Sequence, residues 1–187
     1  WEWFNPSRMD ILNLVFALGG IAMSLPSVIQ MFYGKPQISL SFGERDDDQA
    51  KTLIGEIHNV PCVNRFLCFI GVKTSPAEDT WASFSIYEKG TNKLAFTPAI
   101  LPTINTYNGP GSQRAVIPAS TIPGVFKIVS IDKEQRTVFG GDTETVIQPG
   151  LYTVAVSVSV GINEYKAERP LYVTDTYPYA LWGEPLA

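Results

Sequence analysis

The chemistry open to this chain is limited by its single histidine, His58. A Ser-His-Asp or Cys-His catalytic site would have to use this residue, and the sequence contains no Gly-x-Ser-x-Gly motif to supply a nucleophile. In the segment KTLIGEIHNV, alternation along a strand places His58 on the same face as Glu56 and Ile54. We therefore expect His58 to be hydrogen-bonded locally on a strand, and we predict no catalytic residue.

Acidic residues offer a second kind of chemistry, the binding of calcium. The aspartates at residues 46–48 carry the hard oxygen ligands that Ca²⁺ prefers, and Glu78, Asp79 or Asp142 could join them from other loops. Their spacing is not that of an EF-hand, so we expect a solvated charged loop and predict no metal ion. An enzyme that uses carboxylates such as Glu78 and Asp79 is a further alternative, because acids from distant loops can converge. Our prediction is that the protein is not an enzyme.

The cysteines and glycines exclude several other sites. Cys62 and Cys68 have no second cysteine pair and no histidine cluster with which to bind zinc. In a straight strand their sulfur atoms would lie roughly 20 Å apart, and only a turn would permit a disulfide, so we interpret both as buried free thiols. Gly109 and Gly111 are not followed by the Lys-Ser/Thr pair of a phosphate-binding loop. The net charge of −4 gives no basic footprint, so we predict no cofactor and no nucleic-acid partner.

The element that must position everything else is an uncharged stretch at residues 11–33, with Asp10 before it and Lys35 soon after it. As a helix it would extend about 34 Å, enough to cross a bilayer core of roughly 30 Å. Aromatic residues lie near both ends, as they do at membrane interfaces. We therefore predict a single transmembrane helix at residues 11–34, after an N-terminal flank at residues 1–10. A cleaved signal peptide and a buried helix of a soluble protein are the alternatives.

Small residues within this stretch suggest contact with another helix. Gly20 and Ser24 form a small-xxx-small pair, which lets helices approach closely, and Pro26 should kink the helix. More Lys and Arg residues follow the stretch than precede it, so the positive-inside rule places the following domain in the cytoplasm. The cysteine pair, which is no disulfide framework, favours the same side. We predict a cell-membrane localisation, the lipid bilayer as a partner, and contacts of Gly20 and Ser24 with a protein partner or a second copy.

The rest of the chain has the composition of short strands joined by tight turns, with many Val, Ile, Thr and Tyr residues and frequent Gly and Pro. Residues 43–49 and 105–113 are predicted loops because charged residues or Gly and Pro dominate them. We expect one β-sandwich domain at residues 35–174. The main predicted strands are residues 37–42, 51–60, 80–88, 124–132, 151–160 and 164–173.

A local pattern near the end of this domain suggests its fold type. Pro149 and Gly150 form a corner that leads into a strand with Tyr152 near its start. The pattern resembles the last two strands of immunoglobulin-like and fibronectin-like sandwiches, in which such a tyrosine hydrogen-bonds to the backbone upstream. The resemblance covers residues 148–173 and implies an immunoglobulin-like antiparallel β-sandwich with that role for Tyr152. It implies no particular function.

The C-terminal tail, residues 175–187, carries Tyr177, Tyr179 and Trp182. These aromatics either dock on the domain itself or form a recognition peptide, because aromatic anchors dominate interface energetics, and we take them as candidate partner contacts. The whole sequence thus predicts a mainly β, single-pass membrane protein. We expect it to act as a protein-interaction or structural module, for example as a subunit of a membrane complex. The alternative is a membrane-tethered ligand or calcium sensor.

Overall fold

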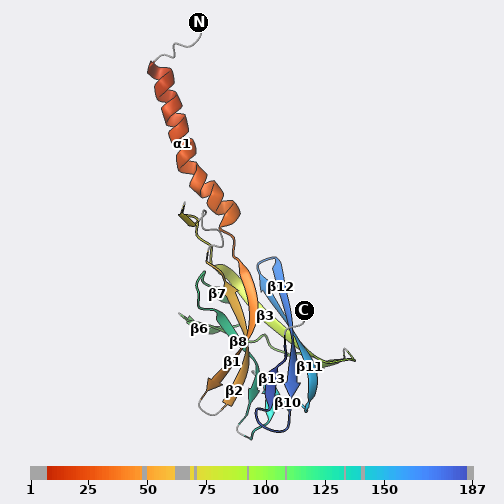
Figure 1. The fold of residues 1–187 in the computed structure, drawn as a ribbon. Coiled ribbons are helices and arrows are strands. Elements are labelled where there is room, and N and C mark those ends of the chain that lie inside the picture. The colour runs from red at the N-terminus through yellow and green to blue at the C-terminus, as the bar shows by residue number, and fades with distance from the viewer. Residues whose placement is uncertain are drawn as a thin grey trace.

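The computed structural model describes residues 8–47, 50–61, 68–69, 71–91, 93–107, 109–132, 134–139 and 142–184. A helix, α1 (Arg8–Tyr33), is followed by short and long strands that pair in two antiparallel sheets. The helix extends away from one end of the strand-containing domain (Figure 1). The mainly β character predicted from the sequence is therefore confirmed.

The first sheet is built on the long hairpin of β1 and β2, and its strand order is β1-β2-β8-β5-β6. Strand β9 pairs with β8, and β10 pairs with β9. The strands of the first sheet are β1 (Ile38–Asp47), β2 (Ala50–Asn59), β5 (Ile104–Thr106), β6 (Gly109–Ser112), β8 (Gly124–Ile131), β9 (Thr137–Phe139) and β10 (Asp142–Val146).

The second sheet is built on the hairpin of β11 and β12, and its strand order is β13-β12-β11-β3-β4. Strand β7 pairs with β3 outside this path. The strands of the second sheet are β3 (Ala77–Glu88), β4 (Leu94–Phe96), β7 (Ala115–Ile117), β11 (Gly150–Val160), β12 (Asn163–Val173) and β13 (Ala180–Trp182).

The inward faces of the two sheets share one apolar core. On β3 the side chains of Ala82, Phe84 and Ile86 are buried while their sequence neighbours are half-exposed, as the alternation of a strand requires. Phe126 and Ile128 enter the same core from β8 in the first sheet. This arrangement is consistent with a β-sandwich, in which burial of both apolar faces drives the sheets together.

The corner before β11 carries the hydrogen bond that the sequence pattern implied. The Tyr152 hydroxyl donates to the backbone carbonyl of Gln148, at 2.8 Å. The ring is 8% exposed, and its burial, followed by the nearby charge of Glu88, raises the pKa of the Tyr152 hydroxyl. Tyr152 therefore ties the incoming chain to the start of β11.

Two predicted loops are partly strands. Strand β1 continues through most of the charged segment that we predicted to be a loop, and Glu44 and Lys51 form a 2.7 Å ion pair across the hairpin. Residues 105–113 contribute to β5 and β6 despite their Gly and Pro content. In both places cross-strand pairing outweighs local preference, since β-propensity depends strongly on context.

The helix differs from the prediction in its capacity to cross a membrane. In the part of the chain that the structure describes, no helix is long and apolar enough to cross a membrane. The predictions of a transmembrane helix at residues 11–34 and of a single-pass cell-membrane localisation, with its cytoplasmic side, are therefore wrong. The helix begins at Arg8 and so includes Asp10, while polar Asn13 and Gln30 further dilute its apolar sequence.

Candidate interaction surfaces

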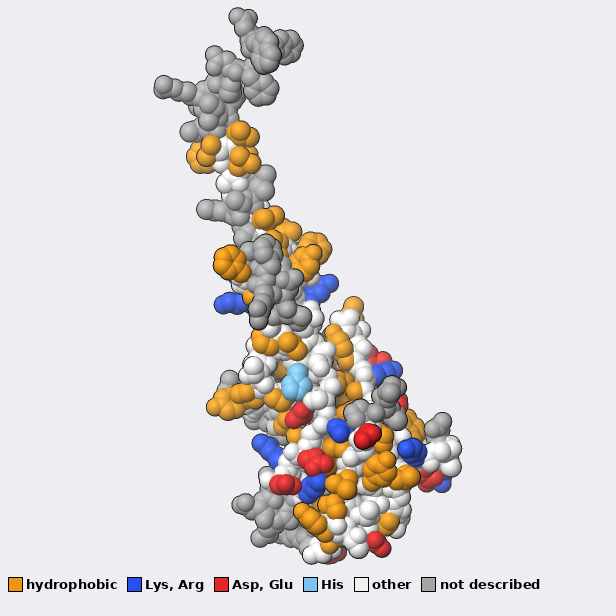
Figure 2. Space-filling view, viewed as in Figure 1, with side chains coloured by type: hydrophobic (Ala, Val, Ile, Leu, Met, Phe, Trp, Pro, Cys, Tyr) orange, Lys and Arg blue, Asp and Glu red, His pale blue; other side chains and the backbone are white. Residues whose placement is uncertain are grey.

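Helix α1 presents apolar side chains to solvent in every direction. Phe16 is 71% exposed, and Val15 and Val28 are also well exposed. At about 100° per residue, these three positions are spaced around the whole circumference of the helix. Figure 2 shows the apolar side chains along the helix, clear of the β domain. The helix therefore offers a large apolar surface that the described part of the domain does not cover.

The last turn of α1 is fastened to the β domain through the side chain of Gln30. The Gln30 side-chain amide donates to the Lys73 backbone carbonyl at 2.5 Å, and the Lys73 backbone amide donates to Gln30 Oε1 at 2.9 Å. The next residues continue this joint, because the Ser75 amide donates to the Gly34 carbonyl at 2.6 Å. Gln30 therefore acts as a two-way connector between the helix and the segment before β3.

The predicted helix contacts lie on the open part of α1. Gly20 is exposed, and a Cβ atom built on it would meet nothing within 4 Å. Ser24 is exposed one turn further along the helix. Both residues remain predicted partner contacts.

The aromatic residues of the tail divide into two groups. Tyr177 is 80% exposed and touches only the edge of Tyr179 among the ring contacts of the described residues. Tyr179 is half-buried, and its hydroxyl donates to Gln135 Oε1 at 2.6 Å. Gln135 belongs to the turn between β8 and β9, so Tyr179 links the tail to the first sheet.

Trp182 is the more deeply anchored residue of the tail. It lies on β13, which pairs with β12, and its indole N–H donates to the Gly43 carbonyl at 2.8 Å. Its ring packs edge-on against Phe42, with centroids 5.0 Å apart, and the Arg169 guanidinium lies over it at 5.7 Å. Arg169 also donates to the Phe42 carbonyl. Trp182 thus closes one side of the sandwich by bridging β12 and β1.

The single histidine has the local bonding expected from the sequence. On the face shared by β1 and β2, the Ser41 hydroxyl donates to Glu56 Oε2 at 2.6 Å and lies 2.9 Å from His58 Nε2. The same histidine nitrogen is 3.4 Å from that carboxylate. A Ser-His-acid triad instead needs the acid on the opposite ring nitrogen from the nucleophile. The cluster therefore lacks triad geometry.

The acidic residues do not converge among the described residues, where no group of three or more possible ligands could hold a metal ion. Asp79 is paired with Arg114 through both carboxylate oxygens, at 2.9 and 3.1 Å. Asp46 is exposed and pairs in register with Lys51 across the β1–β2 hairpin. Asp48 and the side chains of Asp47 and Asp142 lie outside the described residues.

The cysteine interpretation requires a correction. Cys68 is exposed and disulfide-bonded, so our interpretation of it as a buried free thiol is wrong. Cys62, the other cysteine of the sequence, lies outside the described residues. Residues 68–69 are helical, so the distance of a straight strand does not apply at Cys68. Disulfides persist mainly in oxidising compartments, so cysteine content gives no support to a cytoplasmic domain.

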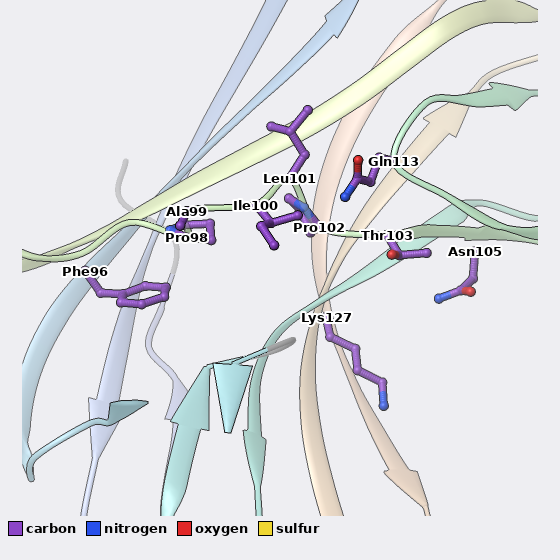
Figure 3. A pocket seen from close by; sticks show the side chains of 10 residues that line it. All are labelled: Phe96, Pro98, Ala99, Ile100, Leu101, Pro102, Thr103, Asn105, Gln113 and Lys127. Carbon is purple, nitrogen blue, oxygen red and sulfur yellow. The ribbon is translucent and has the colours of Figure 1, made fainter. Parts of the chain in front are cut away.

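A cleft opens where the chain crosses from β4 in the second sheet to β5 in the first, and we call it the crossover cleft. Its volume is about 460 Å³. Figure 3 shows apolar residues at one end and polar residues at the other. It is lined by Phe96, Pro98, Ala99, Ile100, Leu101, Pro102, Thr103, Asn105, Gln113 and Lys127.

A shallower trough runs over the outer face of the second sheet, with a volume of about 650 Å³. Its lining includes small polar residues of β3 and β11, among them Ser83, Ser85 and Ser157. Ser157 donates to Glu164 at 2.6 Å, and this bond, with that from Lys166, lowers the pKa of the Glu164 carboxyl. The trough is thus a polar surface with its own internal bonds.

Comparison with known proteins adds no assignment. No protein-family model matches the chain, and no curated protein is similar to it in sequence. Function must therefore be argued from the surfaces themselves.

Sequence reasoning missed the crossover cleft because its residues come from three separate stretches of the chain, residues 96–105, Gln113 and Lys127. The one local signal is a pair of prolines, Pro98 and Pro102, that enclose an apolar tripeptide. A rigid apolar loop between two sheets is a recognisable feature, but the lining contributed by Gln113 and Lys127 depends on tertiary structure.

Proposed function

We propose that the protein is a non-enzymatic interaction module, in which a β-sandwich presents an apolar helix to the helices of an assembly. The observation that carries this proposal is the exposure of α1 around its full circumference. An amphipathic helix with one apolar face would pack on one neighbour, whereas a helix that is apolar all round is normally enclosed. We infer that α1 is surrounded by apolar helices of other chains.

The β domain supplies the rigid base for this helix in the proposal. Its likeness to immunoglobulin-like or fibronectin-like sandwiches is supported by the corner bond of Tyr152 and by the β11–β12 hairpin. Domains of this shape are common carriers of contact surfaces, although the fold alone determines no partner. Gln30 then sets the direction in which the helix leaves the base.

Site-specific photo-crosslinking in the native cell tests the proposal. A photoreactive residue is placed in turn at Phe16, Val28 and Val15, which face three directions, and the crosslinked products are identified by mass spectrometry. The matched control is Tyr107, which is 77% exposed on the β domain. We expect defined crosslinked products from all three helix positions and none of the same products from Tyr107.

The pattern of products distinguishes the possible assemblies. Products with a second copy at all three positions would make the assembly a homo-oligomer, and products with another chain would make it a mixed one. Products from one position only would contradict enclosure, because they would show a single contact face. The absence of any protein product from α1 would reject the proposal.

A further inference from the structure

We propose that the crossover cleft binds a small anion with an apolar tail, of the class of medium-chain carboxylates. This site is separate from α1 and does not depend on the function proposed above. The volume of about 460 Å³ lies within the range of small-ligand sites, which is roughly 300–1,000 Å³. Such sites combine an apolar wall with a few convergent polar groups, and the cleft has both.

The apolar end of the cleft is preorganised. The Phe96 ring is stacked on Phe139, with centroids 3.5 Å apart and planes 7° from parallel, so it is held in place from the first sheet. Pro98 and Pro102 fix their own φ angles and so limit the freedom of the loop between them. Ile100 is 69% exposed within this rigid loop. A hydrocarbon chain lying against it would remove apolar surface from water, which is favourable.

The polar end selects the charge of the ligand. Lys127 is the one charged side chain among the described residues that line the cleft, and no carboxylate lines it. Figure 3 shows Thr103, Asn105 and Gln113 at the same end as Lys127. The ammonium and the side-chain amides can donate to a carboxylate, and charge-assisted hydrogen bonds of this kind are the stronger ones. A cationic head group would instead be repelled by Lys127.

A glycine on β6 keeps this polar end open. A Cβ atom at Gly111 would collide with the amide oxygen of Asn105 and with the methyl group of Thr103. The missing side chain therefore lets both residues occupy their positions at the cleft. Gly111 acts as a positioning residue, because it determines where the donors lie without lining the cleft itself.

The test is a residue-resolved NMR titration of the ¹⁵N-labelled full chain with octanoate, octylammonium and acetate, each below its micelle-forming concentration. Octylammonium has the same tail with the opposite charge, and acetate has the head group without the tail. Residue resolution matters because the apolar surface of α1 can bind any such tail. We expect octanoate to shift the amide signals of residues 96–105 and those of Gln113 and Lys127 in a saturable way, and the other two compounds to bind there at least about tenfold more weakly.

Two variants sharpen this test. Lys127→Glu should weaken octanoate binding at the cleft by about tenfold or more, and Lys89→Glu, an exposed lysine outside the cleft, should leave it unchanged. Gly111→Ala should weaken binding through displacement of the donors, with a shifted Asn105 side-chain signal as its signature. Equal binding of octylammonium, shifts confined to α1, or undiminished octanoate binding by Lys127→Glu would each overturn the proposal.

Discussion

Helix α1 and the C-terminal tail are both rich in apolar or aromatic side chains, yet the domain uses them in opposite ways. Trp182 and Tyr179 of the tail are bonded into the sandwich, through Gly43 and Gln135 respectively. The large apolar side chains described on α1 remain mostly exposed, and the hydrogen bonds of Gln30 join its last turn to the domain. The tail therefore completes the fold, whereas the helix is available for contacts with other molecules.

The difference follows from what each segment can pair with. Strand β13 pairs with the edge of β12, and the indole N–H of Trp182 donates to the Gly43 carbonyl on β1. The hydrogen-bonding groups of both the backbone and the side chain therefore have partners. A helix has already satisfied its backbone internally and needs only an apolar neighbour. The core residues of the β domain are buried between its own two sheets, so they are not available to α1.

The largest expected difference between the tail and the helix is in the free energy of unfolding, when Trp182 of the tail is truncated. Trp182→Ala removes the edge contact with Phe42, the hydrogen bond to Gly43 and the interaction with Arg169, so we expect the free energy of unfolding to fall by about 2–3 kcal/mol. Urea denaturation measures the change. The matched truncation Leu18→Ala on α1 should change it by less than about 0.5 kcal/mol. Similar losses for the two variants would show that the helix is also part of the fold.

The connector at the base of the helix gives the second effect. Gln30→Ala removes two hydrogen bonds to Lys73, which should cost roughly 1–2 kcal/mol of coupling between helix and domain while leaving the β core intact. We expect the distance distribution between spin labels at residues 16 and 107 to broaden in a pulsed EPR measurement.

Gln37→Ala is the matched control for the connector, because Gln37 bonds through its backbone: its amide donates to Asn59 Oδ1 at 3.0 Å, and its carbonyl accepts from the Val60 amide at 2.8 Å. Its distance distribution should equal that of the parent chain. An unchanged distribution in Gln30→Ala would mean that other contacts direct the helix.

The sequence predicted those strands in which buried and exposed residues alternate along a short stretch of the chain. Strands β3 and β11 follow from runs in which apolar and small polar residues alternate, and the corner role of Tyr152 follows from its place after Pro149 and Gly150. These features depend on neighbours within a few residues. Their physical causes, strand alternation and a short tyrosine–backbone bond, operate at that range.

Features that depend on distant partners could not be predicted in this way. The donor and acceptor of the bond from Trp182 to Gly43 lie 139 residues apart, so the sequence left open whether the tail docks on the domain or on a partner. The membrane prediction failed for a related reason, because the count of uncharged residues ignored where the helix begins and what its last turn contacts. The crossover cleft likewise depends on distant residues, because Lys127 on β8 lies far along the sequence from the loop between β4 and β5.

A smaller effect separates the two tyrosines of the tail. Tyr179→Phe removes the hydrogen bond to Gln135 and should lower the free energy of unfolding by about 1 kcal/mol. Tyr177→Phe makes the same change at a residue that is 80% exposed, and we expect a loss below about 0.5 kcal/mol. Urea midpoints of the two variants measured side by side decide the point. Equal midpoints would mean that the bond to Gln135 adds no net stability in solution.

The smallest expected effect lies in the turn that presents Gln135 to the tail. The Asp132 carboxylate accepts from the backbone amides of Arg136 and Glu134 and from the Arg136 guanidinium. The backbone bond from Arg136 is the first cause of the lowered pKa of Asp132. Because the folded pKa lies below the unfolded value of about 3.9, this contribution to stability is present above that pH and is lost as the pH falls through the folded pKa.

Asp132→Asn tests this contribution directly, since the amide keeps an acceptor but cannot titrate. The difference in urea midpoint between the parent chain and the variant should be constant near neutral pH and should shrink as the pH falls from about 4 toward 2. In the background of Tyr179→Phe the difference near neutral pH should be smaller, because the turn then no longer holds Gln135 for the tail. A difference that is the same in both backgrounds would show that the turn and the tail are energetically independent.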